Sequence, residues 1–132
     1  MKVSSEVYDR VMTWMKKEKK NYINGEWVRG EGEVIKLYPI SKLSQALTDA
    51  GYPRDTQILR KWERWGTVPP AIFHTGVKKK KRLYSEEQIN MFVAVAKHCD
   101  IKQGKSVKKF SELIWINLGE LNNKIVEERN NG

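Results

Sequence analysis

The feature that most constrains the fold is a segment with two unlike faces, TQILRKWERWGTVPP, which begins at Thr56. Four apolar residues recur in it at spacings that put them on one side of a helix: Ile58, Leu59, Trp62 and Trp65. The opposite side is polar and mostly cationic: Gln57, Arg60, Lys61 and Arg64. Asp55 or Thr56 is expected to cap this helix, and Gly66 to end it. A core position is expected for both tryptophans of the segment and for the other three: Trp14, Trp27 and Trp115.

A second short helix is predicted directly before this one. Its apolar residues share one face at helical spacing: Ile40, Leu43, Leu47 and Ala50. Ser41 is a suitable N-cap and Gly51 a suitable stop, and the sequence YPRD then makes a short turn. Two helices joined in this way, the second lined outward with Arg, Lys and Gln, are typical of the helix-turn-helix arrangement. Side chains of these types reach the base edges and phosphates of DNA.

A run of five basic residues follows: Lys78, Lys79, Lys80, Lys81 and Arg82. It lies in AIFHTGVKKKKRLY, which predicts two short β pieces around a glycine-containing tip, in other words a wing. In a wing these side chains would run along a phosphate backbone, with Arg82 the best placed. A solvated tip is the alternative. Tyr84 is expected either to pack the wing against the core or to reach a phosphate with its hydroxyl, and His74 is expected in a loop without a ligand role.

The charge of the chain agrees with a polyanionic partner. Its 132 residues suffice for one compact domain, and 25 Lys and Arg against 16 Asp and Glu give a net charge of +9. Such an excess favours nucleic acid or an anionic membrane surface, although many soluble proteins are basic for solubility alone. A single cysteine, Cys99, excludes an internal disulfide and a multi-cysteine metal site. We therefore expect neither a cofactor nor a bound metal.

The N-terminal part adds two predicted elements. Residues 4–20 carry an apolar helical face followed by the basic stretch KKEKK. Glycine-containing turns then flank a hairpin with strands near residues 26–29 and 33–37. The N-terminal stretch has no continuous apolar run, and no segment approaches the roughly 20 apolar residues that span a bilayer. We expect a cytoplasmic, nucleoid-associated protein.

Two further helices are predicted after the wing. Ser85 opens the first with a capping box to Gln88, and its buried face is formed by Ile89, Phe92, Val93 and Ala96. After a loop, residues 107–129 are helical in pattern, with Gly119 as a candidate break or kink. Four residues of this last helix form an apolar stripe with heptad-like spacing: Ile114, Leu118, Leu121 and Ile125. We expect the stripe to pair with a second copy of the chain; burial against the same domain is the alternative.

The order of these pieces resembles the MerR family of winged helix-turn-helix DNA-binding proteins. That family has an Ile-x-x-Leu helix, an Arg-aromatic-Tyr-Glu recognition helix that ends in Gly, a Pro soon after, and a wing that ends in Arg-x-Tyr-Ser. The matching positions here are Ile40, Leu43, Arg60, Trp62, Glu63, Gly66, Pro69, Arg82, Tyr84 and Ser85. Lys61 stands where the family has its first aromatic residue. The resemblance implies a mainly α fold with a small β wing, and a transcription regulator that reads a (pseudo)palindromic site as a homodimer.

Three parts are expected: a helix and hairpin extension over 1–37, a winged helix-turn-helix domain over 38–104, and a dimerisation helix over 105–132. The expected function is sequence-specific binding of double-stranded DNA through the basic helix and wing residues named above. Two other classes stay open. One is an architectural DNA-binding factor for excision, packaging or chromosome anchoring, whose N-terminal extension recruits another protein. The other is a basic module for an acidic protein or anionic membrane. An enzyme is not expected, because no nucleophile–base pair and no phosphate-cradling glycine loop stands out.

Overall fold

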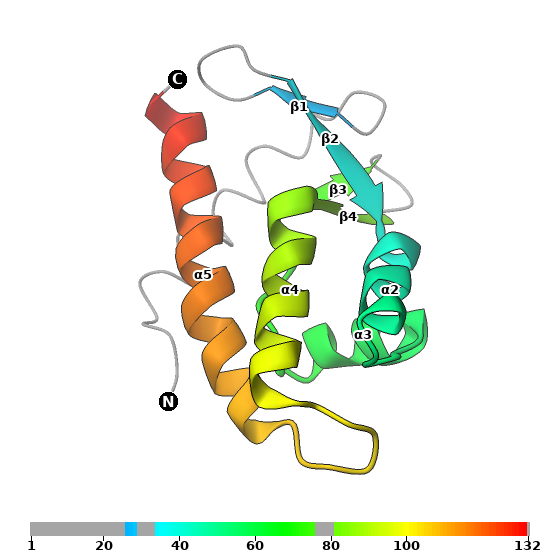
Figure 1. Ribbon diagram of the computed structural model, residues 1–132. Helices are drawn as coiled ribbons and strands as arrows, with labels where there is room; N and C mark the ends of the chain where they lie inside the picture. The colour runs from blue at the N-terminus through cyan, green and yellow to red at the C-terminus, as the bar shows by residue number, and fades with distance from the viewer. Residues whose placement is uncertain (1–25, 29–33, 76–80, 132) are drawn as a thin grey trace.

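The computed structural model describes residues 26–28, 34–75 and 81–131 of the chain (Figure 1). Within these residues the fold is mostly helical, with four helices and a small antiparallel sheet. The sheet lies at one end of the helical part, and the loop between the last two helices lies at the other (Figure 1). The helix predicted over residues 4–20 falls outside the described residues, and so do Lys78, Lys79 and Lys80.

The sheet has the strand order β1-β2-β4-β3, and every neighbouring pair is antiparallel. Its strands are β1 (Glu26–Val28), β2 (Val34–Pro39), β3 (Phe73–Thr75) and β4 (Lys81–Ser85). The predicted N-terminal hairpin is confirmed in β1 and β2, but β2 continues to Pro39 and pairs there with β4. The two β pieces of the predicted wing are confirmed as β3 and β4. His74 lies in β3 opposite Arg82 and is buried, so its predicted loop position is wrong.

Two short helices follow β2. Helix α2 (Ile40–Asp49) begins directly after Pro39, and no side chain caps its first amides. The prediction that Ser41 is the N-cap is therefore wrong, because the helix already begins at Ile40. Helix α3 (Thr56–Arg64) is capped by Asp55, whose Oδ1 accepts a hydrogen bond from the Ile58 amide at 2.8 Å. Glycines with positive φ follow both helices and end them as predicted, at +94° for Gly51 and +76° for Gly66.

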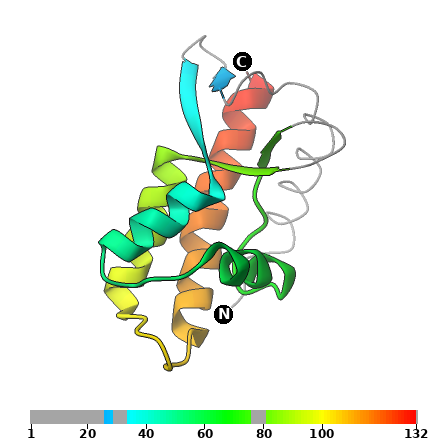
Figure 2. The same ribbon diagram turned by 90° about the vertical axis from the view of Figure 1, so that its right-hand side faces the viewer.

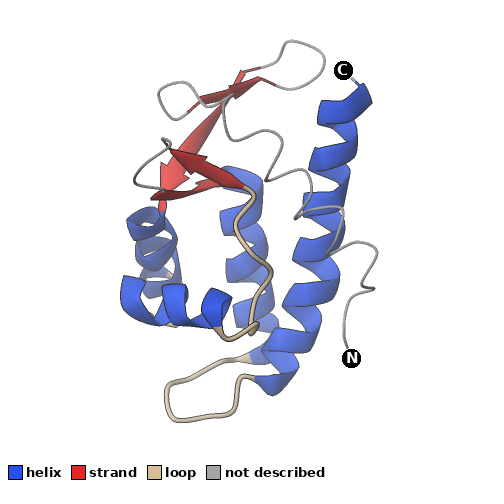
Figure 3. Cartoon of the chain, turned by 180° about the vertical axis from the view of Figure 1, so that it is seen from behind, coloured by secondary structure: helices blue, strands red, loops and turns tan. Residues whose placement is uncertain are grey.

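The two longer helices are α4 (Glu86–Cys99) and α5 (Lys108–Asn131), which pack side by side (Figures 1 and 3). The predicted capping box is present: Ser85 Oγ accepts from the Gln88 amide at 3.2 Å, and Gln88 Oε1 accepts from the Ser85 amide at 2.8 Å. Helix α5 continues through Gly119 without a break. A buried hydrogen bond of 2.9 Å, from Gln88 Nε2 to Asn122 Oδ1, fixes the position of α4 along α5.

The core has two parts, and α5 contributes to both. The larger part combines apolar residues of α2, α3, α4 and the first half of α5. The smaller part lies under the sheet and is made of Leu37, Ile72, Phe73, Leu83, Ile125 and Val126. Leu121 is half-buried and packs against both parts. Because α5 spans both, it is an integral part of this fold.

The apolar stripe of α5 is covered by the same chain. Ile114 is completely buried, and Leu118 and Ile125 are buried as well. Of the two alternatives for this stripe, burial against its own domain is therefore the one that the structure shows. The expectation that Ile114, Leu118, Leu121 and Ile125 form a dimer seam is not met, because α4 and the sheet already occupy that surface.

Candidate nucleic-acid interface

Helix α3 separates its apolar and cationic residues between core and solvent. Leu59 and Trp62 are 3% and 4% exposed, and the Trp62 ring lies 5.2 Å from that of Phe110 on α5. On the opposite side Gln57, Arg60 and Arg64 are exposed, and Lys61 is half-buried. The predicted division of the helix is confirmed for these residues. The charged side chains stay outside because burial of an unpaired charge is costly, whereas the tryptophan stabilises the fold by its apolar area.

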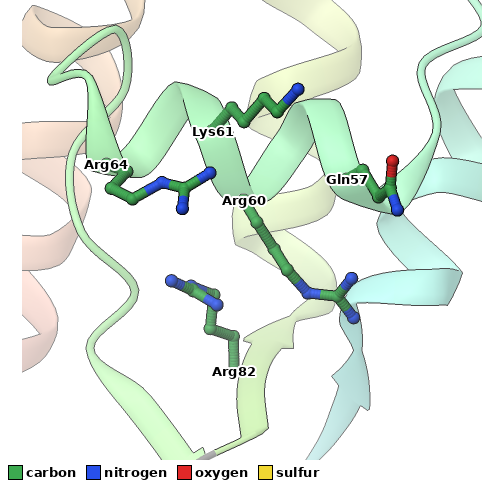
Figure 4. A pocket seen from close by; sticks show the side chains of 5 residues that line it. All are labelled: Gln57, Arg60, Lys61, Arg64 and Arg82. Atoms are coloured by element: carbon green, nitrogen blue, oxygen red, sulfur yellow. The ribbon is translucent and has the colours of Figure 1, made fainter.

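The outward side of α3 forms one wall of an open pocket of about 440 Å³. Five side chains line this pocket: Gln57, Arg60, Lys61, Arg64 and Arg82 (Figure 4). Four come from α3, and Arg82 points toward them from β4 (Figure 4). Four of the five carry a positive charge, and no acidic side chain is among them. Residues that the sequence separates by 25 positions thus meet on one cationic surface.

Glu63 joins this helix to the hairpin. Its carboxylate pairs with Arg82 Nε, and its Oε1 accepts a weak hydrogen bond from the Ala71 amide at 3.4 Å. The Glu63 side chain is 15% exposed, so water screens the ion pair only in part. The ion pair therefore links α3 to β4 rather than two residues of the same helix. Because the pair uses the Nε of Arg82, the guanidinium keeps its terminal nitrogens for a further partner.

A second pocket, of about 310 Å³, adjoins the first. It is lined by the start of α2, the start of α3 and β4: Pro39, Ile40, Ser41, Thr56, Arg60, Lys81 and Arg82. Arg60 and Arg82 line both pockets, which makes the cationic surface continuous from α3 to β4. Lys81 is exposed at the beginning of β4, as expected for the basic run. Figures 2 and 3 show α3 and the β3–β4 hairpin on the same side of the molecule.

Tyr84 belongs to the core rather than to this surface. It is 7% exposed and meets the Phe92 ring edge-on, with centroids 6.2 Å apart. Burial raises the pKa of the Tyr84 hydroxyl far above its usual value, and the nearby Glu63 carboxylate raises it further. The packing role predicted for Tyr84 is confirmed. The expected phosphate contact is not supported, because Tyr84 lines neither pocket.

Trp65 is the clearest departure from the sequence-based prediction. Its side chain is 66% exposed, and it is the one exposed large hydrophobic residue among those whose side-chain burial the structure describes. The helix ends at Arg64, and the turn at Gly66 brings Val68 into the core, where it is buried. Amides of Thr67 and Val68 both donate to the Trp62 carbonyl, at 2.7 and 3.3 Å, and hold this turn. The chain therefore fills the core with Val68 and leaves Trp65 outside.

The turn before α3 is fixed by Arg54, a residue that the sequence did not single out. Arg54 is buried, and its Nη2 donates to the Ile101 carbonyl at 2.7 Å. The guanidinium also lies over the Trp62 ring, 5.6 Å from its centroid. Ser44 Oγ donates to the Arg54 carbonyl at 2.6 Å from α2. These contacts tie the start of α3 to α2 and to the loop after α4, which gives the cationic face a fixed direction.

The described residues offer no sign of a metal site: no three His, Cys, Asp and Glu side chains gather to bind an ion. None of the helices in this part of the chain has the length and apolar character needed to cross a bilayer. Comparison of the chain with protein-family models, with curated proteins and with solved structures gave no match. Its function is therefore inferred from its own geometry and charge.

Proposed function

We propose that this chain binds double-stranded DNA, with α3 in the major groove and the β3–β4 hairpin along the neighbouring phosphate backbone. The observation that carries the proposal is the shared pocket of about 440 Å³, where α3 directs Gln57, Arg60, Lys61 and Arg64 toward the same space as Arg82 of β4. A major groove about 12 Å wide admits one helix, and phosphates border it on both sides. A duplex thus supplies a recess for α3 and negative charge for the hairpin.

The electrostatics of the surface support a polyanion. Glu63 balances the charge of Arg82, and the like charges of Arg60, Lys61 and Arg64 around the same pocket repel each other. Binding of phosphates would relieve that repulsion and release counterions. Arg60 and Arg82 line both pockets, so we assign them to the phosphate backbone together with Lys81. Gln57, near the start of α3, and Lys61, in its middle, both line the larger pocket and are our candidates for base-edge contacts. Arg64 extends the cationic face toward the end of the helix.

We further propose that the fold is a winged helix-turn-helix of MerR type and that the chain regulates transcription. The order α2, turn, α3, β-hairpin and α4 is the order of that arrangement. The Glu63–Arg82 ion pair connects two of the positions that match the family pattern. Leu43 of α2 and Trp62 of α3, two further matching positions, are buried in the same part of the core. Binding of two copies to a palindromic site is part of this proposal, with a contact surface other than the apolar stripe of α5.

Duplex binding tests the proposal by fluorescence anisotropy, after selection of a preferred sequence from random DNA. Arg60→Ala removes a proposed phosphate contact and is expected to weaken binding to the selected site and to other duplexes alike, by about 1.5–3 kcal/mol. Replacement of Lys78 to Lys81 by Ser, which leaves the Glu63–Arg82 pair intact, is expected to weaken all sequences alike. Removal of one phosphate-binding side chain lowers the slope of log K against log salt by about one. Lys124→Ser is the matched control, because Lys124 is an exposed lysine on α5 that lines neither pocket.

Two results would contradict the proposal. Equal affinity for heparin and for the selected duplex would identify a general anion-binding module. Unchanged duplex binding at every salt concentration after the Lys78–Lys81 replacement would remove the hairpin from the interface. A palindromic consensus from the selection would support two copies per site, and a consensus without symmetry would argue against them.

A further inference from the structure

Trp65 stands at the border of the cationic face of α3. The Trp65 amide donates to the Lys61 carbonyl at 2.8 Å, so the helical geometry continues as far as this residue. Residues four apart on a helix are neighbours on its surface, which puts the indole beside Lys61, one of the side chains that line the larger pocket. Arg64, which lines the same pocket, directly precedes Trp65 in the chain. An exposed indole therefore adjoins the positive charges of the candidate interface.

The backbone around Trp65 is held in place. Trp115 Nε1 on α5 donates to the Gly66 carbonyl at 2.8 Å, and Ser111 Oγ donates to the Thr67 carbonyl at 2.7 Å. The Gly66 amide in turn donates to the Glu63 carbonyl at 3.1 Å. Hydrogen bonds from two turns of α5 thus anchor the residues that directly follow Trp65. An aromatic side chain on a fixed backbone loses little conformational freedom on binding, which is a property of residues that dominate binding energies.

The occupant of this position has to offer apolar surface next to negative charge. A water-exposed indole is unfavourable in the free chain, and its two basic neighbours disfavour a purely apolar partner. The backbone of DNA alternates the apolar face of a deoxyribose with a phosphate. The same duplex that receives α3 therefore satisfies both requirements at the end of the helix.

We propose that Trp65 packs its indole on a deoxyribose of the bound duplex, beside the phosphate held by Arg64. This proposal rests on the proposed function, DNA binding by α3, and adds an uncharged contact to that interface. The contact contributes to affinity without releasing a counterion, because no charge is neutralised. Lys61 and Arg64 supply the salt-dependent part of the same contact area.

The test compares Trp65→Ala, Trp65→Phe and Arg64→Gln with the wild-type chain in anisotropy titrations over a range of salt concentrations. Trp65→Ala is expected to weaken duplex binding about tenfold at every salt concentration and to leave the salt slope unchanged. Trp65→Phe retains an aromatic ring and should recover most of the loss. Arg64→Gln is expected to lower the slope by about one. Thermal unfolding should be nearly unaffected by Trp65→Ala, because the side chain is mostly exposed.

Tryptophan fluorescence gives a direct readout of the contact. The chain has five tryptophans, so DNA titrations of the wild type and of Trp65→Phe are subtracted to isolate Trp65. Quenching that disappears in Trp65→Phe supports the contact. Full duplex affinity of Trp65→Ala, together with a loss for Arg60→Ala, overturns the Trp65 contact and leaves the proposed function intact. No salt-dependent duplex binding by the wild type overturns both. A smaller sedimenting species for Trp65→Ala than for the wild type identifies a second copy as the occupant and also overturns the contact.

Discussion

Both the outward face of α3 and the apolar stripe of α5 were expected to contact another molecule. In the structure the first is exposed and the second is buried. Arg60 and Arg64 remain exposed and line one pocket, whereas Ile114 and Leu118 are buried in the core of the same chain. Apolar area gains stability against any surface that excludes water, and the nearest such surface is α4. Burial of an unpaired guanidinium among apolar side chains is costly. Regular spacing of apolar residues therefore predicts that they are buried, but it does not predict whether the same chain or another molecule covers them. Clustered charge predicts an exposed surface.

Helix α3 and the turn after it contact the first turns of α5. Trp62 on the inner side of α3 and Phe110 at the start of α5 lie with their rings 5.2 Å apart and tilted by 42°. Ser111, the next residue of α5, donates to the Thr67 carbonyl after α3. The first turn of α5, directly before the apolar stripe, thus supports the helix that presents the cationic face. Variants of Phe110 should therefore change the stability of the fold, whereas variants of the outward residues of α3 should change DNA binding.

Phe110→Ala is expected to have the largest effect. Phe110 is fully buried, and its truncation should lower the free energy of unfolding by about 3–5 kcal/mol, through reduced apolar burial and the cavity that remains. Phe110→Leu keeps most of the volume and should cost about 1 kcal/mol. Urea denaturation followed by circular dichroism measures both. At a temperature where it is folded, Phe110→Leu should bind duplex DNA like the wild type, because Phe110 does not reach the cationic face. A loss of a few tenths of a kcal/mol for Phe110→Ala would mean that α5 is not part of the core.

Much of this fold follows from local signals in the sequence. The capping box at Ser85, the Asp55 cap and the glycines after α2 and α3 act within a few residues, and each predicted the helix boundary that the structure has. The inward and outward faces of α3 also follow from spacing alone, up to Arg64. Local signals do not report which surface covers an apolar stripe. The partner of the α5 stripe was therefore open in the sequence and is decided by the packing of α4.

For the same reason, only part of the candidate site could be predicted from the sequence. Gln57, Arg60, Lys61 and Arg64 follow from one helical face, and the sequence identified all four. That Arg82 faces them depends on the pairing of β4 with β2 and on the Glu63 carboxylate, which are contacts over many residues. Trp65 was assigned to the core because helical spacing was extended by one position, whereas the turn at Gly66 puts Val68 there instead. Arg54 carries no local signal of its burial.

Glu63→Gln tests whether the charge of Arg82 belongs to the cationic face of α3, and its effect should be intermediate. The variant loses the ion pair with Arg82, which is partly screened by water, and we expect a loss of about 1 kcal/mol in the free energy of unfolding. The charge of Arg82 is then no longer balanced, so the salt slope of duplex binding should become steeper by about one. Glu120→Gln on α5 is the matched control, because it removes the same charge from an exposed position away from both pockets. Equal slopes for the two variants would show that Arg82 lies outside the interface.

Tyr84→Phe should have the smallest effect and bears on the boundary of the interface. Because Tyr84 is buried and lines neither pocket, duplex affinity at pH 7 should stay within about 0.5 kcal/mol of the wild type. The effect of Tyr84→Phe on stability is expected in alkaline solution.

Burial raises the pKa of Tyr84 above its usual 10.0, so the unfolded chain loses this proton at a lower pH than the folded chain. The resulting contribution to stability is fully present below pH 10 and declines as the pH rises toward the folded pKa. Tyr84→Phe lacks that decline, and the difference between the two chains in urea denaturation from pH 9 to pH 11 measures it. A loss of duplex binding as large as that of Arg60→Ala would instead return Tyr84 to the DNA-contacting surface.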